Sequence, residues 1–298
     1  MPAKADLTGD AWRTDSWNLA PGDEVVPGCV MQSLLGGGRR HEVYAAFDEE
    51  RLAPVVVKIV RPGRVKDTAV LKAMRNEIDI LSRLTHPVVV RILDSMASGP
   101  RPFISQERVS GRTLYNVIKR DGPISAERAT ELGVALASAI HFTHQRGIVH
   151  LDIKPENVIL GRPPRLIDFG MACSIDTASR MSGLCGTPPY AAPEQCSPPG
   201  TGTPVPASDV WGFGVTLYEA TTRTRPFRKG DPDAAAPLDS RFPQLADEPT
   251  AMPTGLPSVF TRIVMECLRP DPADRPTAAE VFFALAQQVG APAPTDTE

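Results

Sequence analysis

Long apolar runs and a surplus of positive charge are both missing from this 298-residue sequence. No apolar stretch approaches the ~18 residues that a membrane-spanning helix needs, and the polar residues 1–23 lack the apolar core of a signal peptide. The formal net charge of −3 gives no basic footprint for nucleic acid. We therefore expect a cytoplasmic protein that has no membrane segment and no nucleic-acid partner.

Cysteine is also scarce, since the chain has five, an odd number, and none in a C-x-x-C or Cys/His ligand spacing. The sequence thus predicts neither a disulfide framework nor a zinc site. Apolar residues, at 42%, are sufficient for a large core, and the length allows two lobes around a cleft. The ends lack sustained periodicity, so we predict a flexible lead-in over residues 1–27 and a disordered tail over 290–298.

The most informative stretch of the sequence is HLDIKPEN at residues 150–157, just before the apolar run 158–160. It brings a carboxylate, an ammonium and a carboxamide into one loop, from Asp152, Lys154 and Asn157. The acid can take a hydroxyl proton, the cation can lie on a transferring phosphate, and the amide oxygen can ligate magnesium. This set of groups is suited to phosphoryl transfer.

The string also resembles the catalytic loop of protein kinases, usually H-R-D-x-K-x-x-N. Further motifs follow in the order of that family: Asp168-Phe169-Gly170 resembles D-F-G, residues 186–190 resemble the substrate platform of Ser/Thr kinases, and residues 192–194 resemble A-P-E. The chain is identified as a member of the protein kinase superfamily, similar to the bacterial eukaryotic-like (Hanks-type) serine/threonine kinases. The resemblance covers about residues 30 to 288.

Residues 30–35 and 42–47 predict two strands joined by a glycine-rich turn. Backbone N–H groups of such a turn can approach phosphate closely, although a plain hairpin turn is an alternative. Compared with the kinase pattern G-x-G-x-x-G-x-V, the chain has Gly36 and Gly38 on the first two glycines and Val43 on the valine. His41 replaces the third glycine, which weakens the expected cover over the phosphates.

The next predicted strand, residues 54–60, contains Lys58 within an apolar run. A buried lysine needs a carboxylate partner, unless it snorkels at a strand edge. The helical periodicity of residues 67–84 offers Glu77. The resemblance implies that Lys58 contacts the α and β phosphates of ATP and pairs with Glu77 of helix αC.

The resemblance implies an α+β, bilobal protein-kinase fold. A small β-rich N-lobe with helix αC would span residues 28–109, a larger and mainly helical C-lobe 110–289, and the ATP cleft would lie between them. The residues that would bind ATP are Leu35, Gly36, Gly38, Val43, Val56, Lys58, Glu77, Glu107, Val109 and Ile159. Asp152 and Lys154 would be catalytic, and Asn157 and Asp168 would hold Mg²⁺, with Mn²⁺ as an alternative.

Two further strands are predicted in the N-lobe, at 88–93 and 102–106. In the C-lobe, strands are predicted at 158–160 and 165–167, and helices from Ser125 to about 146, from about 208, over 257–268, and from the capping box at Thr277. We expect Asp209 to accept N–H bonds from the catalytic loop, and Arg275 to pair with Glu194. Residues 223–254 show no placeable helix.

The implied activity is transfer of the ATP γ-phosphoryl group to Ser or Thr of protein substrates, with autophosphorylation and, as an option, self-association. Leu151, Cys173 and Gly183 stand where relatives often have a phosphate-binding arginine, a second basic residue and a phosphosite. A phosphate added to the activation loop would lack its usual cationic pocket and so would do little to order the loop. We therefore hypothesise a non-RD kinase whose activity does not depend on activation-loop phosphorylation. The alternatives are a nucleotide-binding pseudokinase or scaffold, supported by His41, and a small-molecule kinase.

Overall fold

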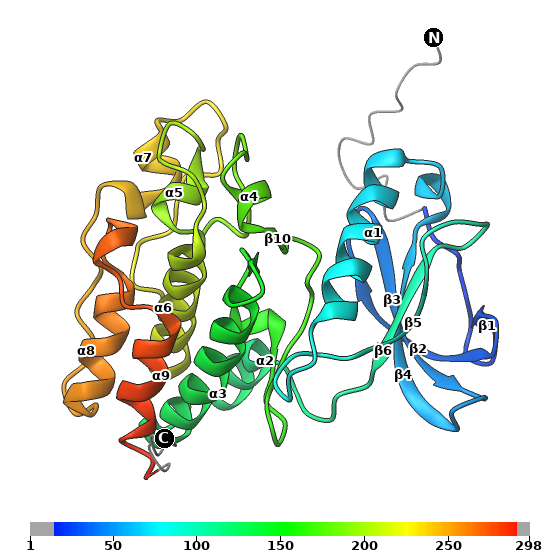
Figure 1. Cartoon of the computed structure of the whole chain (residues 1–298), viewed down its shortest axis with the longest axis horizontal. Helices are drawn as coiled ribbons and strands as arrows, with labels where there is room; N and C mark the ends of the chain where they lie inside the picture. Colours follow the sequence, from blue (N-terminus) through cyan, green and yellow to red (C-terminus); the bar gives the residue numbers. More distant parts are fainter. Residues whose placement is uncertain (1–14, 291–298) are drawn as a thin grey trace, which may run out of the picture. The chain divides into compact units, whose positions relative to one another are not determined.

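The computed structural model describes residues 15–290, and the chain divides into two compact units (Figure 1). Unit 1 comprises the chain up to Thr85 together with Val90–Val109, and unit 2 comprises His86–Val89 and the chain from Ser110 onward. The units therefore meet in sequence at 109/110, where we placed the lobe boundary, but residues 86–89 go with unit 2. Within residues 15–290, no helix is long and apolar enough to cross a membrane.

Unit 1 is built on one antiparallel sheet in the order β1-β2-β3-β4-β6-β5. The strands are β1 Glu24–Val26, β2 Cys29–Gly37, β3 His41–Asp48, β4 Ala53–Val60, β5 Ile92–Met96 and β6 Phe103–Glu107. The strands predicted at 30–35, 42–47, 54–60 and 102–106 are present.

The strand predicted at 88–93 is wrong over most of its length, because β5 begins only at Ile92. Val88 and Val89 are buried in unit 2, where the Val88 carbonyl accepts a hydrogen bond from Leu166 N at 2.6 Å and Val89 forms a β-bridge with Leu166. An apolar β-branched run does not reveal which partner buries it.

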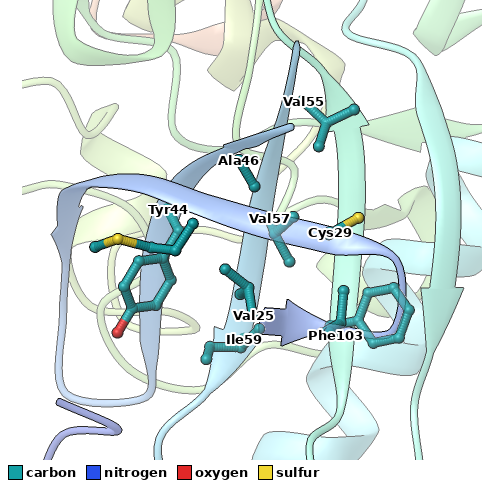
Figure 2. Packing of buried hydrophobic residues seen from close by; sticks show 10 residues of the cluster. Val25, Cys29, Tyr44, Ala46, Val55, Val57, Ile59 and Phe103 are labelled. Carbon is teal, nitrogen blue, oxygen red and sulfur yellow. The ribbon is translucent and has the colours of Figure 1, made fainter. Parts of the chain in front are cut away.

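Two layers of apolar side chains form the core of unit 1. One face of the sheet buries Val25, Tyr44, Val57, Ile59 and Phe103 among others (Figure 2). The other cluster includes Val60, Ile104 and, from helix α1 (Thr68–Arg83), Val70 and Met74. Helix α1 begins where predicted, because the Asp67 carboxylate accepts hydrogen bonds from Ala69 N and Val70 N.

The flexible lead-in that we predicted for residues 1–27 differs from the structure over the part that is described. Val25 and Val26 in β1 are buried, and the Trp17 indole donates to Val60 O at 2.9 Å. The guanidinium of Arg101 lies 4.5 Å from the Trp17 ring centroid. These contacts are long-range in sequence, so local periodicity could not show them. Residues 1–14, and the predicted tail at 290–298 apart from Gly290, lie outside the described part of the chain.

Unit 2 is mainly helical, with α3 (Ala126–His144) in contact with α6 (Pro206–Thr222) and α9 (Ala278–Ala286), and α6 also in contact with α8 (Ser258–Cys267). Ser125 caps α3, and the capping box of Thr277 and Glu280 begins α9, both as predicted. Helix α2 (Leu114–Asp121) was not predicted. The unplaced segment 223–254 forms only α7 (Leu238–Arg241) and the 3₁₀ turn η4 (Pro243–Leu245).

The other elements of unit 2 are short and follow the motifs. They are β7 Ile148–Val149, η3 Pro155–Asn157, β8 Val158–Ile159, β9 Arg165–Leu166, β10 Cys173–Ser174, α4 Ile175–Ala178, α5 Pro193–Cys196 and η5 Pro272–Asp274. Strand β7 pairs with β10 and β8 with β9, so the segment around D-F-G lies beside the catalytic loop. The strands predicted at 158–160 and 165–167 are thus present.

Candidate active site

The first group of candidate residues lies in unit 1, around Lys58 on β4. Lys58 is paired with Val43 on β3 and with Ile104 on β6. Its ammonium donates to both oxygens of Glu77 from α1, at 3.0 and 2.9 Å. The Glu77 side chain is only 2% exposed and that of Lys58 15%. The ion pair predicted from the sequence is therefore formed, and it offers a fixed positive charge at the middle of the sheet.

The glycine-rich turn connects β2 to β3. Gly36 has φ 155°, and a Cβ on Gly37 would lie 2.6 Å from His41 O, so both positions depend on glycine. Gly38 N donates to His41 O at 3.0 Å, which closes the turn. Leu35, on the strand that enters the turn, is 54% exposed. The hairpin and its tight backbone are thus present.

The remaining predicted nucleotide residues are spread over three elements. Val56 lies on β4 opposite Gln106, and Glu107 ends β6 with its N–H donating to Arg91 O at 3.0 Å. Val109 is the last residue of unit 1. Ile159 lies in unit 2 on β8, bridged to Thr113. Of the ten ATP residues predicted, nine belong to unit 1 and Ile159 to unit 2.

A buried carboxylate organises the catalytic loop of unit 2. Asp209 on α6 accepts hydrogen bonds from His150 N at 2.8 Å and Leu151 N at 2.7 Å, as predicted, and its Oδ2 lies 2.9 Å from His144 Nε2. Burial by itself raises the pKa of Asp209, but the hydrogen bond and charge of His144 and the contacts with His150 outweigh it and hold the pKa below its usual range. The anion thus fixes the backbone that leads to Asp152.

Asp152 is the centre of a compact group of side chains. Its Oδ2 accepts from Lys154 Nζ at 2.6 Å and its Oδ1 from Thr187 Oγ1 at 2.6 Å, while Lys154 Nζ also donates to Thr187 Oγ1 at 2.6 Å. Asn157 Nδ2 donates to Asp152 O and Oδ2, at 2.8 and 3.2 Å. A carboxylate base, a cation and a hydroxyl therefore meet at one point, with the carboxylate only 9% exposed.

The candidate metal ligands, Asn157 and Asp168, are brought together by the β8–β9 pair. Ile167 N donates to Asn157 O at 2.8 Å, which places Asp168 next to the asparagine backbone. Because Asn157 Nδ2 is engaged by Asp152, the amide oxygen Oδ1 is the atom left for a cation. An amide oxygen and a carboxylate are hard ligands of the kind that Mg²⁺ and Mn²⁺ accept. The residues present thus fit a divalent cation.

Leu151 stands where an arginine is usual, and its side chain is buried among apolar groups. It is 3% exposed and lies in a cluster with Val149, Cys173, Ala178 and Cys185. Its φ of 61° falls in the left-handed region, which a branched residue rarely adopts. Leu151 therefore joins the catalytic loop to the activation segment through apolar contact rather than charge.

The substrate platform, residues 186–190, is fixed from behind by two buried glutamines. Gln195 Nε2 donates to Leu151 O at 2.9 Å and to Cys185 O at 3.1 Å. Gln244 Nε2, from η4, donates to Pro188 O and Ala191 O, both at 2.9 Å. One carbonyl of the platform, that of Pro188, and the carbonyls of Cys185 and Ala191 at its two ends are thus held in place, while Pro188 and Pro189 remain exposed.

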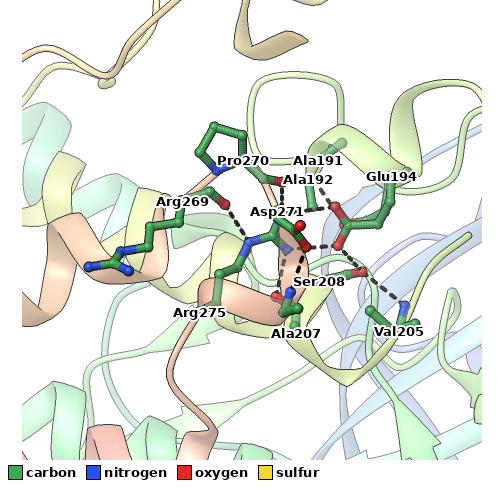
Figure 3. A network of polar contacts seen from close by, with 12 residues as sticks. Ala191, Ala192, Glu194, Val205, Ala207, Ser208, Arg269, Pro270, Asp271 and Arg275 are labelled. Atoms are coloured by element: carbon green, nitrogen blue, oxygen red, sulfur yellow. Dashed lines mark hydrogen bonds and ion pairs between the residues drawn. The ribbon is translucent and has the colours of Figure 1, made fainter. Parts of the chain in front are cut away.

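The predicted pair of Glu194 and Arg275 is formed and fully enclosed (Figure 3). The guanidinium donates to Glu194 Oε1 and Oε2 at 2.7 and 2.9 Å. It also donates to three backbone carbonyls, of Arg269 at 2.7 Å, Ala207 at 3.0 Å and Pro270 at 2.9 Å. Ser208 Oγ adds a bond to Glu194 at 2.6 Å. This network anchors the end of the activation segment.

Sequence reasoning missed three contributors to the site. Thr187 was seen as part of the platform, but not as a partner of Asp152 and Lys154, although its place in the G-T-P motif was the available signal. The roles of Gln195 and Gln244 could not be predicted from the sequence, because a buried amide side chain is recognised only when the positions of its backbone partners are known.

The fold of the two units and the arrangement around Asp152 define a protein kinase domain. The family model for the protein kinase domain matches residues 29–284, and the chain belongs to this family. The family uses ATP together with a divalent metal. The resemblance stated from the motifs is confirmed, as is the fold class.

Bacterial serine/threonine-protein kinases are among the relatives of the chain. Serine/threonine-protein kinase PknB of Mycobacterium tuberculosis is 32% identical over 263 residues, which cover 84% of this chain and 41% of that protein. Serine/threonine-protein kinase PkaA of Streptomyces coelicolor is 32% identical over 275 residues, covering 86% of this chain and 49% of the relative. The chain thus spans less than half the length of the curated relatives it matches.

Proposed function

We propose that this chain is an ATP-dependent serine/threonine protein kinase domain that transfers the γ-phosphoryl group to Ser or Thr hydroxyls of proteins. The observation that carries the proposal is the group around Asp152, whose carboxylate is held by Lys154 and Thr187. The names of the bacterial relatives, serine/threonine-protein kinases, agree with it.

The roles of the residues follow from their chemistry. Asp152 orients the acceptor hydroxyl and takes its proton as the oxygen bonds to the γ-phosphorus and the bond to the bridging oxygen breaks. Lys154 lies against the γ-phosphoryl group, and Lys58, held by Glu77, binds the α and β phosphates. Asn157 and Asp168 hold Mg²⁺, which neutralises phosphate charge when bound. Positioning and electrostatics supply most of the rate.

The nucleotide itself would contact the ATP-binding residues predicted from the sequence. In unit 1, Gly36 and Gly38 offer backbone N–H groups to the phosphates, and Leu35, Val43 and Val56 offer apolar surface to the adenine. Backbone groups of Glu107 and Val109 would bind the adenine edge. The tight hairpin around Gly37 and the formed pair at Lys58 support this assignment.

Two observations favour a protein acceptor and an active enzyme. The platform at residues 186–190, which Gln244 holds at Pro188 and Gln195 holds at the preceding Cys185, suits a peptide chain better than a small metabolite. The pseudokinase alternative is not favoured, because Lys58, Asp152, Asn157 and Asp168 are all present and the Lys58–Glu77 pair is formed. Because the reaction needs ATP, we place it in the cytoplasm, and autophosphorylation through self-association belongs to the same proposal.

We further propose that activity does not need a phosphorylated activation segment. The support is the apolar cluster of Leu151 with Cys173 and Cys185, which offers no cation to a phosphate. Ser174, Thr177, Ser179 and Ser182 remain available for autophosphorylation. Phosphatase-treated protein should keep its activity in a short assay, and complete loss of activity would refute this part.

The decisive experiment uses labelled ATP, Mg²⁺ and a generic basic protein as acceptor. Label should appear on serine or threonine, and Asp152→Asn should abolish it. The matched control is Asp239→Asn, which changes an exposed aspartate to the same amide and should leave transfer unchanged. ATP binding without transfer, seen as a nucleotide-dependent rise in melting temperature, would favour the pseudokinase instead.

A further inference from the structure

Beside the glycine-rich turn of unit 1 lies a hydrogen-bonded group of residues, here called the Arg61 cluster. It consists of the buried side chains of Arg61, Glu42 and Tyr44 and of backbone groups of the half-buried Asp15 and Trp17. The side chains of Arg61 and Glu42 are 7% and 2% exposed and form an ion pair at 2.9 Å. Glu42 lies on β3, which leaves the glycine-rich turn, and Arg61 directly follows β4, the strand that carries Lys58.

The guanidinium of Arg61 joins three separate segments. Its Nε donates to the carbonyl of Gly38 at 2.6 Å, and one terminal nitrogen donates to Glu42 Oε1 at 2.9 Å and to Asp15 O at 2.5 Å. The second oxygen of Glu42 accepts from Tyr44 Oη at 2.7 Å and from Trp17 N at 3.2 Å. Both oxygens of the buried carboxylate are therefore satisfied.

The burial of this ion pair is weak evidence that its role is to stabilise the fold. A buried ion pair loses hydration that its attraction often fails to recover, and apolar residues of similar volume can be equally stabilising. A better explanation for the cluster is that it holds another group in position. The group in question is the carbonyl of Gly38, one of the residues assigned to the nucleotide phosphates.

The glycine-rich turn needs such a support. Three consecutive glycines, Gly36–Gly38, have wide backbone freedom that must be given up when phosphate is bound. The third glycine of the family pattern is replaced by His41, whose carbonyl closes the turn by accepting from Gly38 N at 3.0 Å. Arg61 fixes the other side of the same residue, so the backbone is ordered before any ligand arrives.

We propose that Arg61 is a positioning residue for nucleotide binding, which acts by fixing Gly38, and that Glu42 and residues 15–17 hold its guanidinium in place. The proposal rests on the proposed function, since it assumes that the turn covers the ATP phosphates. It also gives a role to residues 15–17, which precede the first strand of the sheet. Asp15 O and Trp17 N make the last two hydrogen bonds of the cluster.

The test compares Arg61→Lys with Arg83→Lys in the full chain. Arg83 lies in unit 1 too, but its pair with Asp79 is exposed, 55% and 68%. Binding of ATP with Mg²⁺ is measured by calorimetry, and the KM for ATP and kcat by phosphate transfer. Arg61→Lys should raise the Kd and KM about fivefold or more, as for the loss of a charged hydrogen bond, with kcat at saturating ATP unchanged within about twofold. Arg83→Lys should match the wild type.

A second variant covers the case in which Arg61→Lys lowers the melting temperature. Glu42→Gln combined with Arg61→Met removes both buried charges and leaves the Gly38 carbonyl without its donor, and it should raise the Kd for ATP by a similar factor. Unchanged ATP affinity in both folded variants would refute the positioning role alone, as would a fall in kcat with no change in KM. Wild-type protein that binds no ATP would refute the proposed function as well.

Discussion

Replacing Arg275 by methionine tests how strongly the end of the activation segment is anchored. Methionine keeps the apolar stem but removes the guanidinium, which donates five hydrogen bonds, two to Glu194 and three to the carbonyls of Arg269, Ala207 and Pro270. The Arg275 side chain is 0% exposed and Glu194 3%, so water cannot replace the lost partner. Leaving one charge of a buried pair alone costs about 3–5 kcal/mol.

For a unit of this size, each kcal/mol lowers the melting temperature by about 2–4 °C, so Arg275→Met should lower that of unit 2 by about 6–20 °C. The assay is thermal and urea unfolding followed by near-ultraviolet circular dichroism, which Trp211 beside the guanidinium helps to report. The control is Arg262→Met, which breaks the largely exposed pair with Glu266 and should cost at most about 1 kcal/mol. Equal losses in the two variants would show that enclosure of the pair contributes nothing.

Further predictions concern the catalytic loop and the thiols. Thr187→Val should lower kcat about 10- to 100-fold, because a hydrogen bond to a charged group is worth about 1.5–3 kcal/mol, while Thr187→Ser should retain most activity; equal rates for the two variants would exclude a role for the hydroxyl bond to Asp152. Asp209 has a lowered pKa in the folded state, so its stabilising effect is complete above the unfolded pKa of about 4 and is lost as the pH falls through the lower folded value. Acid unfolding of the wild type should therefore steepen below about pH 4, and Asp209→Asn, which is less stable at neutral pH, should lose this component; parallel acid curves would contradict the assignment. Burial raises the pKa of Cys173 and of Cys196 to about 12, so neither thiol should react with iodoacetamide at pH 8 in the folded protein, whereas rapid alkylation detected by mass spectrometry would show that the segment opens.

Much of the fold could be predicted because its signals are local. The cap at Asp67, the cap at Ser125 and the box at Thr277 and Glu280 each place a helix start within a few residues of sequence. Strands β2, β3 and β4 follow from apolar runs, the first two of which are separated by glycines. The lysine in an apolar strand needed an acid, and the periodicity of α1 offered Glu77, so this contact could be predicted as well.

What could not be predicted depends on contacts between distant segments. Residues 15–26 have little apolar pattern, and long-range contacts hold them, among them those of Trp17 with Val60 and Arg101 and the pairing of β1 with β2. Val88 and Val89 have the composition of a strand but are buried against Leu166. The segment around α7 is held by Gln244, whose partners are carbonyls more than fifty residues away. Side chains that bind backbone leave no periodic trace in the sequence.

The apolar packing of Leu151 has a consequence for the conditions to which the domain responds. An arginine that grips a phosphate is weakened by salt and switched by a phosphatase. Contacts among Leu151, Cys173 and Cys185 are indifferent to ionic strength and instead lose strength on cooling, as hydrophobic burial does. If activity does not need a phosphorylated activation segment, as proposed above, the contact between catalytic loop and activation segment would respond to temperature rather than to ionic strength.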